Sequence, residues 1–377
     1  MEPYVEIKVE GARLVCPTQR VKKYMEESAD KKVFTPFELK GKKIKNRFIR
    51  SAVNSHLGNT DGTISEADIE MYDILGRGDI GTIITGHNSV DPDLGYRADI
   101  AQPSLGSDDK IAGLRRVAEK IHEYGSLAIA QISHAGPKGL HPIDFNMLST
   151  DEMHRFVDWF TAAAIRAKKA GFDGVQVHIA HWYLLQSVVN RDENHRNDCY
   201  GGSDANRIRL PKEIVESIRK ECGEDFLIYV KINAHNTADA IDDYDLLSYY
   251  VDELVKSGVD LVEVSGSDFT RQTRTAECYY LDAVKALREK FPELPLSLVG
   301  GIYTKESIDK VLETTDFVSF GRTLLTQPDF ILKLKAGEIM KSRCIHCNKC
   351  FEIFATKYER CVFGPVIPQL EETFGHE

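Results

Sequence analysis

Two histidines and a tyrosine lie close together at the end of a run that has the character of a buried strand. The run GVQVHIA covers 174–180, and His178, His181 and Tyr183 mark its end. Two imidazoles and a phenol can hydrogen-bond one carbonyl oxygen and supply a proton. Their spacing brings both imidazoles onto one face if the chain turns helically there. The structural alternative is that the histidines cap backbone groups and the tyrosine belongs to the core.

Two further polar residues interrupt apolar runs: Lys231 lies within LIYVKINA and Gln131 within LAIAQISH. A buried ammonium group needs a negative partner or must lose its proton. Lys231 therefore predicts a bound anionic cofactor or a Schiff base with a substrate, and a lysine that extends to solvent is the structural alternative. Gln131 can donate and accept a hydrogen bond at once.

A scaffold of alternating strands and helices would position these residues. Eight β-rich runs recur, at 47–53, 82–90, 127–134, 174–180, 227–234, 261–267, 296–302 and 316–322. Helical patterns that end on glycine separate several of them, at 108–125, 156–171 and 244–258. This alternation predicts an α/β fold of the (β/α)8 TIM-barrel class. A doubly wound sheet is the alternative, but the glycine-rich turn after its first strand is missing.

The pattern divides the chain into three parts. Residues 1–33 form an N-terminal extension, in which 5–15 is a candidate hairpin followed by a charged connector. Residues 34–335 form the barrel, and a second candidate hairpin at 37–46 could plug its floor. Residues 336–377 form a cysteine-rich C-terminal tail.

A phosphate site is expected after the seventh and eighth strands of such a barrel. The seventh run ends in Gly300 and Gly301, and the eighth ends in Gly321 and Arg322. Glycines let backbone N–H groups approach an anion, and arginine adds a charged fork. The alternative is that each glycine only permits a turn.

The tail carries Cys344, Cys347 and Cys350 at steps of three, and then Cys361. Four thiolates at this spacing suit an iron–sulfur cluster or zinc, and unligated thiols are the third possibility. The other four of the eight cysteines are scattered, so the even count does not imply disulfides.

Charge and hydropathy argue against several kinds of partner. The net charge is −10 and the chain has no long basic block, which disfavours nucleic acid and anionic membranes. No apolar run reaches the roughly 20 residues of a membrane span, and the N-terminus lacks the apolar core of a secretion signal. We therefore expect a cytoplasmic protein that acts on a small molecule, with a homo-oligomer left open.

In combination, these motifs resemble the Old Yellow Enzyme family of FMN-dependent ene-reductases. The resemblance runs from about Phe34 to Arg322 and beyond. It rests on AQISHAG, the His-x-x-His-x-Tyr segment, the stretch from Arg196 to Ser203 with Asn206 and Arg207 after it, VGGI and SFGR. It implies a ping-pong enzyme that uses NAD(P)H to reduce the C=C bond of an α,β-unsaturated carbonyl compound.

The resemblance also implies a role for each site residue. Flavin ring contacts would come from Ser51, Ala52, Asn54, Gly86, Gln131 and Lys231, and phosphate contacts from Gly300, Gly301, Gly321 and Arg322. His178 and His181 would hold the substrate carbonyl oxygen, and Tyr183 would protonate the α-carbon. Several residues depart from the family pattern. Lys231 stands where arginine is usual and Trp182 where glycine is usual. Asn54 stands where threonine or cysteine is frequent, and Asn190-Arg191 where Ser-Pro is common. Trp182 could narrow the pocket or stack on an aromatic substrate.

Larger relatives, 2,4-dienoyl-CoA reductase and trimethylamine dehydrogenase, carry a 4Fe–4S cluster on a similar cysteine pattern. The resemblance therefore implies a possible cluster on Cys344, Cys347, Cys350 and Cys361. Two rival functions remain: a barrel aldolase with Lys231 as its Schiff-base lysine and a bound substrate phosphate, and a non-catalytic flavin- or metal-binding barrel.

Overall fold

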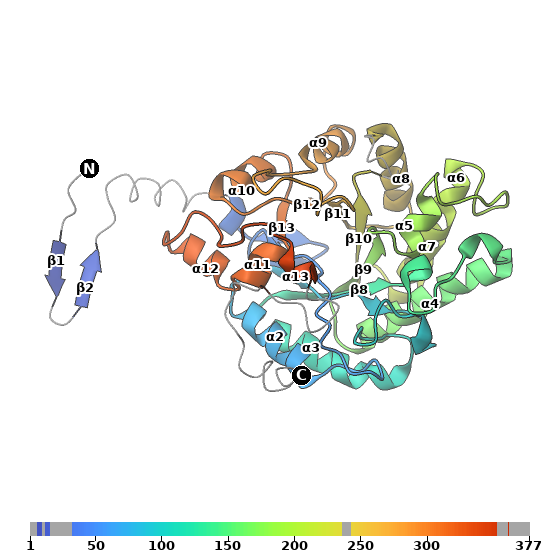
Figure 1. Cartoon of the computed structure of the whole chain (residues 1–377), viewed down its shortest axis with the longest axis horizontal. Coiled ribbons are helices and arrows are strands. Elements are labelled where there is room, and N and C mark those ends of the chain that lie inside the picture. Colours follow the sequence, from blue (N-terminus) through green and yellow to red (C-terminus); the bar gives the residue numbers. More distant parts are fainter. Residues whose placement is uncertain (1–5, 10–11, 16–31, 236–242, 353–360, 362–377) are drawn as a thin grey trace.

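The protein is described by a computed structural model that places residues 6–9, 12–15, 32–235, 243–352 and 361. Its centre is a closed barrel of parallel strands (Figure 1). The barrel strands are β5 (Phe48–Arg50), β6 (Thr82–Ile84), β8 (Leu127–Ser133), β9 (Gly174–Ile179), β10 (Leu227–Asn233), β11 (Leu261–Ser265), β12 (Leu296–Val299) and β13 (Phe317–Phe320). Each pairs with its neighbour in parallel, and β13 pairs with β5 to close the ring. The (β/α)8 prediction is confirmed.

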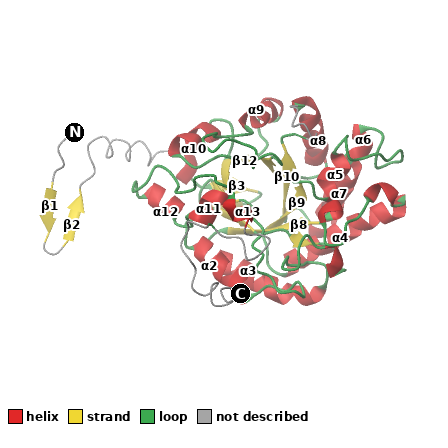
Figure 2. Cartoon of the chain, in the orientation of Figure 1, coloured by secondary structure: helices red, strands yellow, loops and turns green. Residues whose placement is uncertain are grey.

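Helices surround the strands, as the red and yellow elements of Figure 2 show. The long ones are α2 (Glu66–Gly76), α3 (Ile111–His122), α4 (Thr150–Lys169), α7 (Arg209–Cys222), α8 (Tyr244–Lys256), α9 (Leu281–Lys290) and α10 (Lys305–Leu312). The short ones are α5 (Leu184–Val189), α6 (Asp204–Arg207), α11 (Arg322–Thr326), α12 (Phe330–Lys335) and α13 (Lys349–Glu352). A short strand, β7 (Asn88–Ser89), extends beside β8.

The helices form where the sequence combines an apolar stripe with an end signal. In α3 the buried residues Leu114, Val117, Ala118 and Ile121 follow the helical repeat, so one face packs on the barrel. The helix α4 begins six residues before the predicted start at 156. Its start is fixed by a capping box, in which Ser149 and Glu152 bond each other's backbone N–H groups.

The barrel floor is apolar and is closed by a hairpin. Strands β3 (Phe37–Leu39) and β4 (Lys42–Ile44) pair antiparallel, and Leu39 and Ile44 reach into the barrel. They pack against a layer of inward-facing residues: Ile49, Ile84, Ile129, Leu227, Tyr229, Leu261 and Phe317. Each such buried aliphatic side chain contributes about 1.5–3 kcal/mol. The predicted plug is confirmed.

The N-terminal extension contains the expected hairpin, in which β1 (Glu6–Val9) and β2 (Ala12–Val15) pair antiparallel. The charged connector after it lies outside the described residues. Within the part of the chain that the structure describes, no helix is long and apolar enough to span a bilayer.

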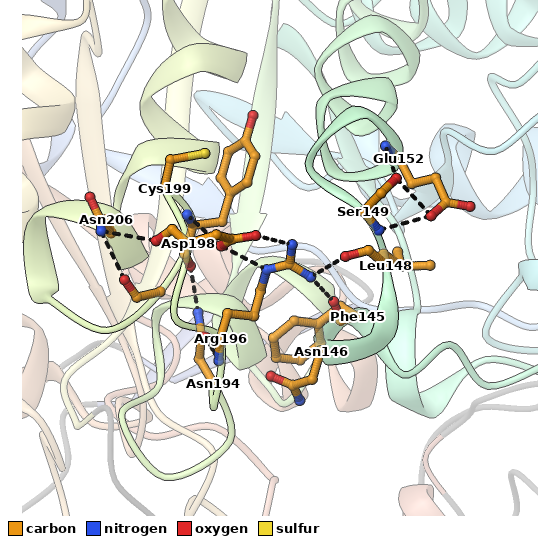
Figure 3. Close-up of polar contacts among 12 residues, drawn as sticks. Phe145, Asn146, Leu148, Ser149, Glu152, Asn194, Arg196, Asp198, Cys199 and Asn206 are labelled. Atoms are coloured by element: carbon orange, nitrogen blue, oxygen red, sulfur yellow. Dashed lines mark hydrogen bonds and ion pairs between the residues drawn. The ribbon is translucent and has the colours of Figure 1, made fainter.

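The motif around Arg196 has a structural role (Figure 3). Arg196 Nη1 donates to the backbone oxygens of Phe145, at 2.5 Å, and Leu148, at 2.7 Å. Its guanidinium also pairs with Asp198, whose carbonyl oxygen accepts from Asn206 Nδ2 at 3.0 Å. These bonds tie the loop after β9 to the loop after β8.

Candidate functional site

A cavity of about 350 Å³ lies at the carboxyl ends of the barrel strands. Twelve of the predicted site residues line it: Ser51, Ala52, Asn54, Gln131, His178, His181, Tyr183, Lys231, Gly300, Gly301, Gly321 and Arg322. Its volume falls in the range of roughly 300–1,000 Å³ that is typical of small-molecule sites. Gly86 and Trp182 do not line it; Gly86 packs instead on Val53, whose carbonyl oxygen would lie 2.9 Å from an added Cβ.

A layer of polar side chains separates this cavity from the apolar floor. Strand register places Lys231 beside Glu263 and Gln131 beside Gln176, all pointing inward. Gln131 Nε2 donates to Gln176 Oε1 at 2.7 Å, and Gln176 Nε2 donates to Glu263 Oε2 at 3.0 Å. Lys231 Nζ donates to Ser51 Oγ at 2.8 Å. Because Lys231 Nζ also lies 3.2 Å from Glu263 Oε2, these side chains form one continuous chain of polar contacts.

Lys231 has a negative partner that the sequence reading missed. Its ammonium lies 3.2 Å from Glu263 Oε2, and the side chains are 2% and 0% exposed. The alternative interpretation, in which Lys231 extends to solvent, is therefore wrong. Glu263 lies within the apolar run LVEVSGS. Lys231 was noticed because it is a charge inside an apolar run, and the same criterion would have identified Glu263. Within the described residues Glu263 Oε1 has no hydrogen-bond partner.

The structure brings His178, His181 and Tyr183 together. Ring centroids lie 5.2 Å apart for the two histidines and 5.3 Å apart for His178 and Tyr183. The chain does not turn helically, as the spacing rule assumed: His181 and Trp182 have left-handed φ angles of 61° and 65°. Such φ values are uncommon outside glycine and cost energy, so the local backbone is strained where the rings converge.

Burial keeps both of these histidines neutral. It lowers the pKa of His181 to about 3 and that of His178 well below its usual value, and the Lys231 charge adds to both shifts. His181 Nε2 is 2.9 Å from Ser265 Oγ, which helps to orient the ring. Burial, with the Asp99 carboxylate nearby, raises the pKa of Tyr183. At neutral pH the site therefore offers neutral imidazoles and a protonated phenol.

A third histidine, His87, lines the same cavity and was also missed by the sequence reading. It lies three residues past the end of β6, and its ring centroid lies 5.0 Å from that of Tyr183. A search for polar residues at strand ends, applied to the second run as it was to the fourth, would have found it.

The opposite end of the cavity has the features of an anion site. Gly301 has a φ of 65°, and a Cβ there would lie 2.4 Å from Tyr279 Cε1, so this position requires glycine. The space beside Gly321 is largely empty: the nearest atom to a Cβ added there would be Val53 Cγ2, at 3.7 Å. Arg322 lies beside it, with its guanidinium 5.6 Å from the Phe269 ring centre. Backbone without side chains beside a guanidinium suits a phosphate group.

The four tail cysteines line a second, smaller cavity that shares Arg322 and His346 with the first. The described cysteines form no disulfide with one another. Among the placed residues, no group of three or more His, Cys, Asp or Glu side chains is arranged around a single metal ion.

A parallel barrel whose cavity holds the Lys231 ammonium at one side and an anion site at the other is consistent with a flavin-binding barrel oxidoreductase. The chain belongs to the NADH:flavin oxidoreductase / NADH oxidase family, whose model matches residues 32–145 and 139–340. The family resemblance read from the sequence is thereby confirmed.

Known relatives agree with this assignment. An "NADH oxidase" of Thermoanaerobacter brockii is 30% identical over 357 residues, which cover 86% of this chain but only 54% of that protein. The "Probable NADH-dependent flavin oxidoreductase YqiG" of Bacillus subtilis is 30% identical over 336 residues, 81% of this chain and 88% of that one. The solved old yellow enzyme homologue of Zymomonas mobilis superimposes with a TM-score of 0.69 at 23% identity, over 83% of this chain and 95% of that one.

Proposed function

We propose that the protein uses NAD(P)H and bound FMN to reduce the C=C bond of an α,β-unsaturated carbonyl compound. The observation that carries the proposal is the convergence of two neutral histidines and a protonated tyrosine on a cavity with an anion-binding end. The cavity suits FMN: Gln131 and Lys231 would hold the pyrimidine edge, and the glycines beside Arg322 would hold the phosphate. When bound, FMN would take a hydride from NAD(P)H and deliver it to the substrate.

The protein's own residues would do the rest of the chemistry. His178 and His181 would bind the carbonyl oxygen, on which negative charge develops during reduction, and neutral N–H donors can stabilise that charge as an oxyanion hole does. Tyr183 would donate its phenolic proton to the α-carbon, because its raised pKa keeps it protonated. One site serving both reactants in turn would give ping-pong kinetics.

The aldolase alternative is less consistent with the site. A Schiff-base lysine must lose its proton before it attacks, whereas the Lys231 ammonium is ion-paired with Glu263. A non-catalytic flavin-binding barrel would leave the donor set without a purpose, and turnover decides that question.

We also propose that Cys344, Cys347, Cys350 and Cys361 bind an iron–sulfur cluster. What supports this is their shared cavity next to Arg322. Protein purified without oxygen should contain about four irons per chain, since a 4Fe–4S centre is usually held by four thiolates. Cys347→Ser should lose them, and Cys222→Ser, a buried cysteine remote from the tail in sequence, is the control.

The proposed activity is tested by purification, identification of the bound flavin, and steady-state kinetics with NAD(P)H and a simple enone. A yellow protein that oxidises NAD(P)H only when the enone is present supports it. A protein that binds FMN but leaves every enone unchanged would refute the activity while keeping the family assignment.

A further inference from the structure

His87 occupies a special place in the cavity because it faces the residues assigned to the substrate. It is 4% exposed and lines the cavity wall. Its ring centroid lies 5.0 Å from that of Tyr183 and 6.3 Å from that of His178. The histidine pair and the tyrosine already account for the proposed reaction, so His87 is a polar side chain without an assigned role.

The hydrogen bonds around His87 fix which ring nitrogen carries its proton. Gln102 Oε1 accepts from the Ala98 backbone N–H at 2.6 Å, which sets the orientation of the Gln102 amide. Gln102 Nε2 then donates to the His87 carbonyl oxygen at 3.1 Å and lies 2.9 Å from His87 Nδ1. An amide nitrogen only donates, so this contact favours an accepting Nδ1, to which the Ser133 hydroxyl can also donate, and a proton on Nε2.

The Nε2–H group is therefore a preorganised donor. It lies across the ring from Gln102 and from Ser133, whose Oγ is 2.9 Å from Nδ1. No residue in the described part of the chain accepts a hydrogen bond from it. Burial lowers the pKa of His87 to about 4, which keeps the ring neutral. A donor on a cavity-lining side chain that has no acceptor among the described residues points to an acceptor on the ligand.

We infer that His87 is a third hydrogen-bond donor to the substrate, and that the site favours a conjugated dicarbonyl compound. This rests on the proposed function. One carbonyl oxygen lies between His178 and His181, and the second accepts from His87 Nε2–H. The second acceptor is neutral, because the Asp99 carboxylate disfavours a second carboxylate there. Asp99 Oδ2 accepts from Nδ2 of the cavity residue Asn54 at 2.7 Å, which places its charge beside this part of the site.

The kinetic test uses two ring compounds, ketoisophorone and isophorone, which differ by one carbonyl group. We expect His87→Leu to lower kcat/KM for the dicarbonyl compound by about three- to tenfold, the effect of one neutral hydrogen bond. The value for isophorone should change less than about twofold by the same reasoning. His87→Gln is the matched variant, because its amide nitrogen can replace the donor and should restore most of the preference.

A second measurement does not depend on a variant's activity. Nitrogen NMR of the wild-type holoenzyme with labelled histidine, without NAD(P)H, should show His87 protonated on Nε2. Ketoisophorone should shift that resonance and isophorone should not. His87→Gln assigns the signal.

The outcomes separate the two proposals. If neither compound is reduced and neither binds, the proposed function fails. If both are reduced and their ratio is the same in wild type and His87→Leu, only the role of His87 is overturned. A proton on Nδ1 of His87 would also overturn it. So would a change of the flavin midpoint potential in His87→Leu without a change in the ratio of kcat/KM for the two compounds, because that result would assign His87 to the cofactor.

Discussion

Arg322 Nη1 donates to Asn348 Oδ1 at 2.5 Å, so the end of the eighth barrel strand is bonded to the cysteine tail. Asn348 lies between Cys347 and Cys350 in sequence, and Arg322 lines both cavities. The residue expected to bind the flavin phosphate is thus held by the segment expected to bind the cluster. Two cofactor sites that share a side chain should influence one another's occupancy.

The first prediction concerns that arginine. Arg322→Ala should weaken FMN binding roughly 10- to 150-fold, since a charge-assisted hydrogen bond contributes about 1.5–3 kcal/mol and about 1.4 kcal/mol is a factor of ten. Asn348→Ala, which keeps the guanidinium, should have a smaller effect. Flavin released on dialysis is measured by fluorescence. Equal retention of FMN in wild type and Arg322→Ala would count against a phosphate site here.

The second prediction concerns the buried pair of Lys231 and Glu263. Glu263→Gln should destabilise the protein by about 3–5 kcal/mol, because it leaves an uncompensated buried ammonium. Lys231→Met should be similarly costly because it leaves a buried carboxylate. The double variant should lose less unfolding free energy than the two single variants lose together, since neither buried charge then remains.

Chemical denaturation of the four proteins, each saturated with FMN and each free of it, completes this cycle. FMN should restore more stability to Glu263→Gln than to wild type if the ammonium faces the flavin. Simple additivity of the two single changes would contradict a direct coupling between the side chains.

The third prediction separates the roles of the histidine pair and Tyr183. Mixing with NAD(P)H alone measures the first half of the reaction, and His178→Ala or His181→Ala should leave it nearly unchanged. Mixing pre-reduced protein with enone measures the second half, which should slow by about 10²–10³-fold for one lost oxyanion donor.

Tyr183→Phe should give a different pattern. It should bind phenols, which resemble the charged oxygen of the substrate, almost as wild type does. It should still slow the second half of the reaction by about 10²–10⁴-fold, as expected for a lost general acid. If the histidine variants react with enone at the wild-type rate, the pair is structural.

Much of the architecture follows from the sequence because its signals are local. The alternation of apolar runs and helical stripes gave the barrel, and strand ends in a barrel meet at one mouth, so residues as distant as Gln131 and Arg322 could be assigned to one cavity. The hairpin at 37–46 was recognisable for the same reason.

Other features depend on contacts between distant segments. The pairing of Lys231 with Glu263 requires the register of β10 and β11, which periodicity does not supply. The left-handed turn at His181 and Trp182 runs against residue preference and is imposed by the surrounding packing. The donor role of His87 depends on Gln102, whose amide orientation is set by the Ala98 backbone N–H.

The last prediction concerns acid stability. His87, His178 and His181 have pKa values lowered by burial, to about 4 for His87 and about 3 for His181. Between those values and the unfolded value of about 6.5, the unfolded chain binds more protons than the folded one. Stability is therefore complete above about pH 6.5 and falls as the pH drops, by up to about 1.4 kcal/mol per pH unit for each histidine.

One buried carboxyl acts in the opposite direction. Burial raises the pKa of Asp68 to about 6, so its contribution grows as the pH falls through the same window and offsets one histidine of the three. The net expectation is that Tm decreases between about pH 6.5 and pH 4.5. His181→Gln should flatten that decrease, and Asp68→Asn should steepen it. Melting curves that are independent of pH across this window in the wild type would show that the three rings are not held neutral by the fold.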